Sequence, residues 1–373
     1  MIIITTQCFA PKIGGIEALM TGMAESMSAL GKNVLVLADG KVSPNMDKDK
    51  EYSIKRFSGW KPFRRLRKAQ YLHKICNERY VEAIYADSWK SIEYVNKKNK
   101  KILVLAHGTE IPKQYWTIMI DTLRFKKNRI VRSYKNIHKI IANSNYTKDL
   151  MQATLKINQK KIQIIHPGID VYREFISEDE KRYVKQIIKN KHPVITTLAR
   201  VEKRKGHSYI INAIDKLKNS YPNLVYLIAG KGPYLANIKK QVSKLNLTEH
   251  VLFLGWITEP EKSLILKSSD IFAMTPITSG ESVEGFGMAF IDAAFHGVAS
   301  LGSDNGGISD AIVNNKTGIL CDAGNQSEIT SNLKVLIENK KLREELGKNG
   351  KILAEEKFSW RNKVHEYLEA INN

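Results

Sequence analysis

Short apolar runs alternate with amphipathic stretches from one end of the chain to the other. Apolar runs of this kind, separated by longer helical patterns, are typical of buried parallel strands covered by helices on both faces. Helical spacing of apolar residues is clear at 16–30 and 64–79. The runs that predict strands form two series: 2–6, 34–38, 83–86, 102–106, 139–142 and 162–165, then 194–198, 224–229, 251–254, 271–274, 298–301 and 318–320.

The two series predict two domains. Strands that alternate with helices require right-handed crossovers, so each series predicts a doubly wound parallel sheet of the Rossmann-like α/β type, with a cleft between the domains. A polar, charged stretch at 168–191 separates them. We therefore expect a first domain at 1–175, a second at 190–357 and a last helix at 358–373.

The composition is that of a globular protein, with 43% hydrophobic and 26% charged residues. Three widely separated cysteines argue against a disulfide framework or a zinc site and favour a reducing compartment. The apolar start is too short for a signal peptide, and no run reaches the roughly 18 apolar residues of a membrane span. These features predict a cytoplasmic protein.

The net charge of +21 is concentrated in the first half of the chain. Residues 1–190 hold 36 Lys and Arg against 18 Asp and Glu, a net of +18, whereas the remainder has a net of +3. This asymmetry predicts that the first half meets a polyanion, either a membrane surface or a nucleic acid. A compositional bias of the genome is the alternative, although it should tilt both halves alike.

Two strand ends in the first half carry candidate ligand contacts. Gly14 and Gly15 follow the first strand and precede a helix, so their loop is either a phosphate-binding turn at a helix N-terminus or a simple tight turn. It is not the spaced G-x-G-x-x-G fingerprint. His107 ends the strand at 102–106, where it could hydrogen-bond a substrate hydroxyl or serve only the structure.

The first strand of the second half ends in a basic loop. Arg200 and Lys205 lie where ligands of open α/β sheets bind, and both could reach one pyrophosphate, so they are candidate ligands for a nucleotide diphosphate. We interpret Lys203 and Arg204 as solvated. Gly230 follows the next strand, where it either leaves room for a base or ribose or simply makes a turn.

The most specific segment runs from Glu284 to Asp292, where a Gly-rich turn opens an apolar helix. Glu284 precedes the helix, and the free backbone N–H groups of residues 287–289 point the same way. Asp292 lies inside the helix, and a buried carboxylate needs partners such as sugar hydroxyls. An N-cap acid with a core hydrogen bond is the structural alternative.

Taken together and in this order, these segments resemble family 4 of the glycosyltransferases, enzymes of the GT-B fold. The family's two acids, separated by seven residues, correspond to Glu284 and Asp292, and its Gly-Arg-Leu…Lys-Gly pattern corresponds to residues 199–201 and 205–206. The chain departs from the pattern at Ala199, where the family has Gly, and at Asp292, where it has Glu. A rigid Pro is also missing from the turn at 306–310, which has Ser309.

The resemblance implies two Rossmann-like domains that face each other, and transfer of a hexose from a UDP- or GDP-sugar with retention of configuration. It implies no cofactor and no metal. The last helix at 358–373 would cross back onto the first domain. The implied roles are diphosphate binding by Arg200 and Lys205, sugar contacts by Glu284, Gly287, Met288 and Ala289, a ribose contact by Asp292, and a contact of His107 with the transferred sugar.

In this fold the first domain binds the acceptor, and that is where the positive charge lies. Residues 55–79 hold nine basic side chains against a single acid, with aromatic and aliphatic residues between them, which resembles an interfacial membrane element. A soluble acceptor and a solvated basic face are the alternative. A nucleic-acid-binding protein is a third possibility, but the sequence has no zinc, ribonucleoprotein or helix-turn-helix signature. The residues expected at the inner face of the cytoplasmic membrane, near a lipid-linked acceptor, are Arg64, Arg65, Arg67 and Lys68.

Overall fold

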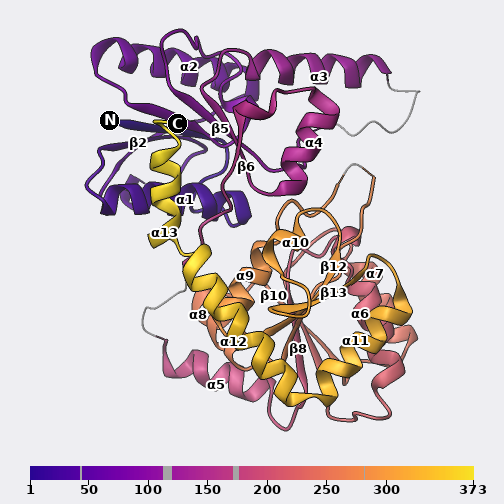
Figure 1. Cartoon of the computed structure of the whole chain (residues 1–373). Coiled ribbons are helices and arrows are strands. Elements are labelled where there is room, and N and C mark those ends of the chain that lie inside the picture. Colours follow the sequence, from indigo (N-terminus) through magenta and orange to yellow (C-terminus); the bar gives the residue numbers. More distant parts are fainter. Residues whose placement is uncertain (43, 112–119, 171–175, 281) are drawn as a thin grey trace. The chain divides into compact units, whose positions relative to one another are not determined.

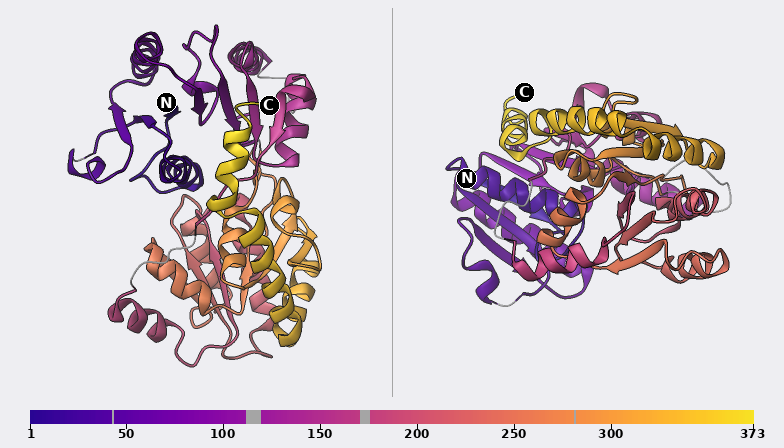
Figure 2. Two further views of the ribbon diagram at one scale, coloured as in Figure 1. Left: turned by 60° about the vertical axis from the view of Figure 1, so that its left-hand side comes forward. Right: turned by 90° about the horizontal axis from the view of Figure 1, so that it is seen from below.

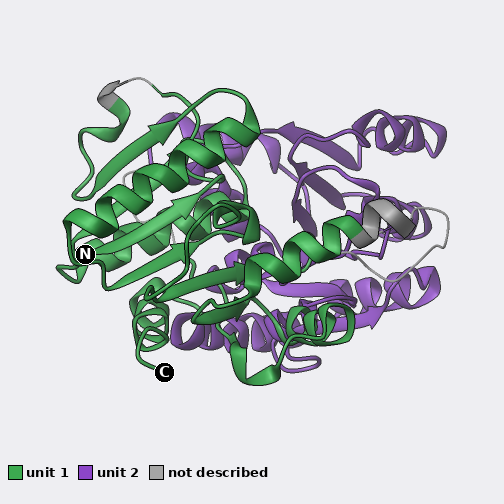
Figure 3. Ribbon diagram, turned by 90° about the horizontal axis from the view of Figure 1, so that it is seen from above, with its two compact units in different colours: residues 1–170, 358–373 green, residues 171–357 purple. Residues whose placement is uncertain are grey.

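The chain folds into two compact units (Figures 1 and 2). The computed structural model describes residues 1–42, 44–111, 120–170, 176–280 and 282–373. The first unit consists of Met1–Asp170 together with Phe358–Asn373, and the second of Val171–Lys357 (Figure 3). Each unit is built around one parallel sheet, so the predicted α/β fold class with two Rossmann-like sheets is confirmed.

Seven strands form the first sheet, in the order β3-β2-β1-β4-β5-β6-β7. The order reverses between β1 and β4, which is the switch point at which doubly wound sheets bind ligands. The elements of this unit are β1 (Ile2–Thr6), α1 (Gly15–Ala29), β2 (Val34–Asp39), β3 (Ser53–Phe57), α2 (Lys61–Glu78), β4 (Ala83–Ala86), β5 (Ile102–Ala106), α3 (Ile120–Tyr134), β6 (Lys139–Ala142), α4 (Asn145–Leu155), β7 (Ile162–Ile164) and α13 (Trp360–Glu369).

The second sheet has six strands in the order β10-β9-β8-β11-β12-β13, with its switch point between β8 and β11. Its strands are β8 (Val194–Leu198), β9 (Val225–Ala229), β10 (Val251–Gly255), β11 (Ile271–Ala273), β12 (Ala299–Asp304) and β13 (Gly318–Asp322). Its helices are α5 (Glu178–Ile187), α6 (His207–Leu217), α7 (Leu235–Lys244), α8 (Glu259–Lys267), α9 (Met288–Phe295), α10 (Ile308–Ala311), α11 (Gln326–Glu338) and α12 (Lys340–Lys357).

One strand, β3, is absent from the strands that the hydrophobic pattern predicts. It pairs with β2 alone at the edge of the first sheet, and Phe57 is its only buried residue. A strand with one neighbour and solvent on its other side needs no apolar run, because most of its side chains stay in contact with water. Helix α5 lies within the stretch interpreted as the boundary, and Val184 packs it against the second sheet.

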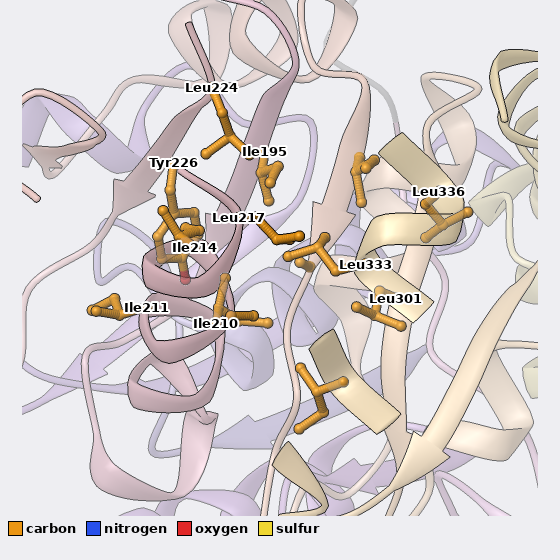
Figure 4. Packing of buried hydrophobic residues seen from close by; sticks show 14 of the residues in the cluster. Ile195, Ile210, Ile211, Ile214, Leu217, Leu224, Tyr226, Leu301, Leu333 and Leu336 are labelled. Carbon is orange, nitrogen blue, oxygen red and sulfur yellow. The ribbon is translucent and has the colours of Figure 1, made fainter. Parts of the chain in front are cut away.

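Alternation along the strands builds a core on each face of a sheet. In β1, Ile2 and Ile4 pack against α1 and α13, whereas Ile3 points to the opposite face, which α2, α3 and α4 cover. In the second unit, Ile195 of β8 and Tyr226 of β9 face helices α6 and α11 (Figure 4). The sheets are therefore rigid, and the turn after the carboxyl end of each strand is held in place.

The last helix, α13, completes the core of the first unit (Figure 2). The Trp360 indole lies against two glycines that have no side chain to exclude it: a Cβ atom on Gly22 would lie 2.1 Å from Trp360 Nε1, and one on Gly168 would lie 2.5 Å from Trp360 Cδ2. The backbone N–H of Ile169 donates to the Phe358 carbonyl at 2.8 Å. The end of the chain is therefore a structural part of the first unit.

We expect Trp360→Ala to lower the free energy of unfolding by about 3–5 kcal/mol, because it leaves a cavity between the two glycines. Urea denaturation followed by circular dichroism measures the change. The neighbouring exposed Arg361 provides the control, and Arg361→Ala should leave the unfolding midpoint unchanged. Equal midpoints for the two variants would contradict the packing role of Trp360.

Candidate active site

At the switch point of the first sheet, one buried carboxylate connects the carboxyl ends of β1 and β4. Asp87 follows β4, and its Oδ2 accepts hydrogen bonds from Thr6 Oγ1 at 2.9 Å and from the Gln7 backbone N–H at 2.6 Å. Its Oδ1 accepts from Ser91 Oγ at 2.6 Å. Because Thr6 ends β1, this carboxylate fixes the start of the loop that leads to α1.

His107 lies beside this carboxylate, at the end of β5. Its Nε2 is 2.9 Å from the backbone carbonyl oxygen of Asp87. A carbonyl oxygen can only accept, so Nε2 carries the proton and Nδ1 is the ring atom left to accept a hydrogen bond in the neutral form. The histidine that the sequence singled out is thus held in one orientation by the switch-point loop.

The glycine loop before α1 is exposed, and its chemistry differs from a bare phosphate turn. Gly14 is the N-cap of α1, and the carboxylate of Glu17 folds back over it, so that a Cβ on Gly14 would lie 2.4 Å from Glu17 Oε2. Gly15 begins the helix. An anion at this N-terminus would compete with Glu17, which weakens the case for Gly14 and Gly15 as donor ligands.

The four cations of α2 were predicted to face a membrane or an acceptor. This prediction is wrong for Lys68, and it is incomplete for Arg64 and Arg65, which pair with acids of the same unit. Lys68 is 1% exposed, and its Nζ donates to Asp39 Oδ1 at 2.7 Å and to the Thr6 carbonyl at 2.8 Å, so it cannot reach a membrane. Arg64 lies 2.8 Å from Asp39 Oδ2, and Arg65 pairs with Glu93. Arg67 alone of the four is exposed, because α2 turns the other three toward the sheet.

Burial is the largest influence on Lys68, and it lowers the pKa of the ammonium group. Asp39 and then Asp87 act in the opposite direction. Together the Lys68–Asp39 pair and Asp87 line the carboxyl edge of β1, β2 and β4 with matched charges. Such a network positions a site and leaves little unbalanced charge there.

In the second unit, a charge cluster stands at the carboxyl ends of the strands. Glu284 Oε2 accepts hydrogen bonds from Lys205 Nζ at 2.6 Å and from Arg204 Nη1 at 2.8 Å. Arg204 also donates to Glu202 at 2.9 Å, and Glu202 lies 3.1 Å from Arg200. The interpretation of Arg204 as a solvated side chain is therefore wrong. Lys203 is exposed as expected.

Backbone geometry holds this cluster in place. Gly206 has a φ of 80°, and a Cβ there would lie 2.0 Å from the Thr275 carbonyl oxygen, so only glycine allows α6 to begin directly behind Lys205. The Ile277 N–H donates to the Arg204 carbonyl at 2.7 Å. The Glu284 carbonyl accepts from the Gly307 N–H at 2.9 Å. Both partners of the ion pair are thus anchored through their own main chains.

The ionisation of Glu284 follows from two opposing effects. Burial of the carboxyl group raises its pKa, but the positive charges of Lys205 and Arg204 and their hydrogen bonds outweigh burial, so the pKa is lowered. Behind Lys205 lies His207, whose ring nitrogens have no hydrogen-bond partner among the described residues. Its pKa falls to about 4 through burial and then the charge of Lys205. The Glu284 carboxyl group is therefore ionised at neutral pH.

The remaining predicted residues lie at the same edge of the second sheet or one turn behind it. Arg200 is 65% exposed on its side chain, so it is free to move toward a ligand. Gly230 packs against the Ala199 carbonyl, which explains a glycine there without any ligand. Gly287 is the N-cap of α9 and lies in the left-handed region, and no side-chain hydrogen bond from the described residues caps this helix.

Asp292 has a partner that the sequence pattern does not single out. Lys262 of α8 lies 3.1 Å from Asp292 Oδ1 and 2.6 Å from Glu259. Burial acts to lower the pKa of Lys262, but the two carboxylates outweigh it and the pKa is raised. A ribose at Asp292 would share the carboxylate with this ammonium group.

Comparison with known families identifies the chain. Residues 13–173 match the family described as Glycosyltransferase Family 4, and residues 178–352 match the family described as Glycosyl transferases group 1. The chain is a family 4 glycosyltransferase. It therefore transfers a sugar from a nucleotide-sugar donor, as the order of its motifs predicts.

Relatives with assigned activities support the same class. The chain is similar to a GDP-mannose-dependent phosphatidylinositol monomannoside mannosyltransferase of Mycolicibacterium smegmatis, with 25% identity over 73% of this chain and 70% of that protein. It is 23% identical to a related mannosyltransferase of Corynebacterium glutamicum, over 96% and 94% of the two chains.

Solved structures share the fold of this glycosyltransferase. The Anabaena protein HepE, solved with UDP and glucose, superposes with a TM-score of 0.80 at 18% identity and covers 100% of this chain and 99% of its own. WaaG, a glycosyltransferase involved in lipopolysaccharide biosynthesis, superposes with a TM-score of 0.75 at 14% identity over the full length of both chains. These likenesses confirm the GT-B fold.

Sequence reasoning missed Arg204 and Lys262 for different reasons. Arg204 stands next to Lys203 and Lys205 in a short turn, where adjacent side chains point in different directions that only the backbone geometry resolves. Lys262 reaches Asp292 from another helix, and no spacing in the sequence reports that contact. Within the described residues, no three His, Cys, Asp or Glu side chains converge as metal ligands would.

We expect Glu284→Gln to lower the free energy of unfolding at pH 7 by about 1–3 kcal/mol, because a neutral amide removes the counter-charge of the partly buried Lys205 and one of the two carboxylates that pair with Arg204. Folding lowers the pKa of Glu284, so its contribution is present above the ordinary value of 4.5 and is lost as the pH falls through the lowered pKa. The difference between wild type and variant should therefore shrink in acid.

Urea titrations between pH 3 and pH 7 measure this difference. The exposed Glu249 supplies a matched control, and Glu249→Gln should follow the wild type at every pH. A wild-type to Glu284→Gln difference that stayed constant across this range would show that the carboxylate is not stabilised by its cations.

Proposed function

We propose that the chain is a retaining, metal-independent hexosyltransferase. It moves a hexose from a UDP- or GDP-sugar to a lipid-linked or cell-envelope glycan acceptor at the inner face of the cytoplasmic membrane. The observation that supports this proposal best is the Lys205–Glu284–Arg204 cluster at the carboxyl edge of the second sheet. It combines cations suited to a diphosphate with a carboxylate suited to sugar hydroxyls.

The cations account for departure of the nucleotide. As the bond between the sugar C1 and the diphosphate breaks, negative charge grows on the diphosphate oxygens, and Lys205, Arg204 and the exposed Arg200 offset it. These positive charges would replace a divalent metal. In a retaining reaction the acceptor oxygen bonds to C1 on the face that the diphosphate leaves, so an oxygen of the diphosphate can take the proton of the acceptor hydroxyl.

The sugar contacts come from the same edge. Glu284 would accept hydrogen bonds from donor-sugar hydroxyls, and the N–H groups of residues 287–289 would face a phosphate or sugar oxygen at the start of α9. Asp292 would bind the ribose together with Lys262. Because Nε2 of His107 is committed to Asp87, His107 would present Nδ1 to a hydroxyl of the transferred sugar.

The relatives leave two donors open and favour a glycolipid acceptor. The mycobacterial relative uses GDP-mannose on a phosphatidylinositol mannoside, whereas HepE was solved with UDP and glucose. The motifs of this chain fit either base. A soluble acceptor remains the alternative, since mannosylfructose-phosphate synthase of Agrobacterium fabrum is also a relative, at 22% identity.

Helix α2 supports a membrane acceptor in a different way from the one its charges predicted. Trp60 and Phe63 are 69% and 61% exposed, their rings lie 5.4 Å apart, and Leu66 continues the same side of the helix. Arg67 and Lys61 flank them. An apolar edge with flanking cations is the pattern of an interfacial helix. No helix among the described residues is long and apolar enough to cross a bilayer.

Lys205→Ala should reduce kcat/KM for donor hydrolysis and transfer by roughly 10- to 150-fold, because it removes a charged hydrogen bond of about 1.5–3 kcal/mol. A thermal-shift panel of UDP- and GDP-sugars first identifies the donor, since a ligand at 100 times its Kd adds about 2.7 kcal/mol of stability. Release of nucleotide diphosphate then gives the rate.

Lys203→Ala is the matched control, because Lys203 lies in the same turn and is exposed; its rate should equal that of wild type. Activity should survive EDTA, and the product should keep the anomeric configuration of the donor by NMR. Equal rates for Lys205→Ala and wild type would refute the diphosphate assignment, and loss of activity in EDTA would refute metal independence.

The double variant Trp60→Ser/Phe63→Ser should bind less to vesicles that contain anionic lipid, because it removes the apolar side chains that enter the interface. Co-sedimentation at low salt measures the bound fraction. Trp256→Ser/Val335→Ser removes two exposed apolar side chains from the second unit and should bind like wild type. If the wild type stayed in the supernatant, the soluble-acceptor alternative would replace the membrane proposal.

A further inference from the structure

A pair of adjoining hollows opens at the amino ends of β4, β5 and β6, on the edge of the first sheet opposite His107 and Asp87. One, of about 700 Å³, is lined by residues 95–100, Arg132 and 135–138. The other, of about 490 Å³, is lined by the end of α2, the start of β4 and the same loop before β5. The two share Asn96, Lys98, Asn99 and Lys100, and we call them together the basic hollow.

The described lining of the basic hollow carries positive charge and no carboxylate. In the part of the chain that the structure describes, no acid forms an ion pair with any of its cations, and the nearby Glu78 and Glu82 pair instead with Lys74 and Lys32, each at 3.8 Å. The seven cations are Arg79, Lys97, Lys98, Lys100, Lys101, Arg132 and Lys135.

This surface differs from the basic stretch of α2. In α2, Arg64 and Lys68 both pair with Asp39, and Arg65 pairs with Glu93. Internal acids therefore offset part of the positive charge of these three side chains. In the basic hollow the charge has no internal partner among the described residues, so the excess charge of the first half of the chain acts on the solvent here.

The titration of neighbouring side chains agrees with a positive field. Burial lowers the pKa of His138, and Lys101 and Lys139 lower it further, against the carbonyls of Ala370 and Ile371. Burial likewise lowers the pKa of His73, and Lys100 adds to that effect. The cations of the basic hollow thus disfavour any further positive charge nearby, which is the condition under which an anion binds well.

We propose that the basic hollow binds the phosphate groups of an extended anionic glycan, the phosphorylated part of the acceptor. The cations would contact the phosphates, and Tyr80, which is 84% exposed at the rim, would offer a face for a sugar ring. The identity of the occupant as an acceptor rests on the proposed glycosyltransferase function.

The shape of the surface favours a glycan over a membrane or a nucleic acid. A membrane meets a convex surface that inserts apolar side chains, whereas this surface is concave and its apolar members Val95 and Ile137 are 5% exposed. A single-stranded nucleic acid uses several stacking platforms along a groove, and Tyr80 is the one exposed aromatic residue in the described lining. A chain of charged sugars needs only the cations and one ring.

The basic hollow is separate from the proposed reaction centre. The strands are parallel, so their amino and carboxyl ends lie at opposite edges of the sheet, roughly 15 Å apart for a strand of five residues such as β5. A glycan bound in the basic hollow would be held by one part of its length while a more distant hydroxyl reacts. The basic hollow would therefore set which acceptors are retained and leave the chemistry to the strand ends.

The test uses the quadruple variant Lys98→Gln/Lys101→Gln/Arg132→Gln/Lys135→Gln, because all four side chains are exposed and the fold does not depend on them. Its matched control is Lys216→Gln/Lys341→Gln/Lys348→Gln/Lys351→Gln, which removes four exposed charges from the second unit. The probe is a fluorescent mannan oligosaccharide that bears phosphodiesters, compared with the same oligosaccharide after its phosphates are removed. Fluorescence anisotropy gives the Kd.

The quadruple variant should bind the phosphorylated oligosaccharide roughly 10- to 100-fold more weakly than wild type, since exposed ionic contacts contribute modestly and add up. The control variant should bind the phosphorylated oligosaccharide like wild type. Removal of the phosphates from the oligosaccharide should weaken its binding to wild type and to the control. Tyr80→Ala should weaken binding of the phosphorylated oligosaccharide but leave the Kd for inorganic tripolyphosphate unchanged. Hydrolysis of the nucleotide sugar should be the same in all four proteins.

Three results would overturn the proposal. Equal Kd values for wild type and the quadruple variant would show that the basic hollow does not bind the oligosaccharide. Tighter binding of a single-stranded oligonucleotide of equal charge would make the ligand a nucleic acid. Loss of binding only to vesicles of phosphatidylglycerol and phosphatidylcholine would make it a lipid surface. Failure of the glycosyltransferase proposal looks different, because wild type would then hydrolyse no nucleotide sugar whatever the Kd values are.

Discussion

Two cations share one oxygen of Glu284, and the second unit is arranged around this contact. Lys205 and Arg204 reach it from the turn after β8, and Glu284 reaches it from the turn before α9, so the pair joins two strand ends that are far apart in the chain. Each turn is fixed by a main-chain hydrogen bond to a third segment. A ligand that took one of these charges would release the other, so binding and local order are coupled in this glycosyltransferase.

The hydrophobic pattern predicted the buried strands of the fold. Strands such as β4 and β5 have the bounds that their apolar runs predict, because a strand covered on both faces is apolar throughout. The edge strand β3 lacks that pattern. The site divides in the same way: Lys205 and Glu284 follow from a motif, whereas the partners Arg204 and Lys262 depend on the distance between side chains from separate elements, which no local pattern contains.

The distribution of basic residues along the sequence also did not show which part of the surface carries unpaired positive charge. The stretch at 55–79 is the most basic by composition, yet α2 directs Arg64 and Lys68 toward Asp39 of β2, and Arg65 toward Glu93 in the loop after β4. The loop before β5 is less conspicuous in the sequence, but its lysines meet no acid among the described residues. What matters for an ionic partner is the charge that remains after internal pairing, and pairing is a property of the folded chain.

The packing of Trp360 against Gly22 and Gly168 also determines when the first unit can finish folding during synthesis. Residues 1–170 emerge early, but α13, which covers Leu19, Met20 and Met23 in their core, is made only after the whole of the second unit. At about 5–20 residues per second, synthesis of the intervening unit takes roughly 10–40 s. During that time an apolar face of the first unit lies uncovered, so the nascent chain is a natural client for a chaperone until α13 has been made.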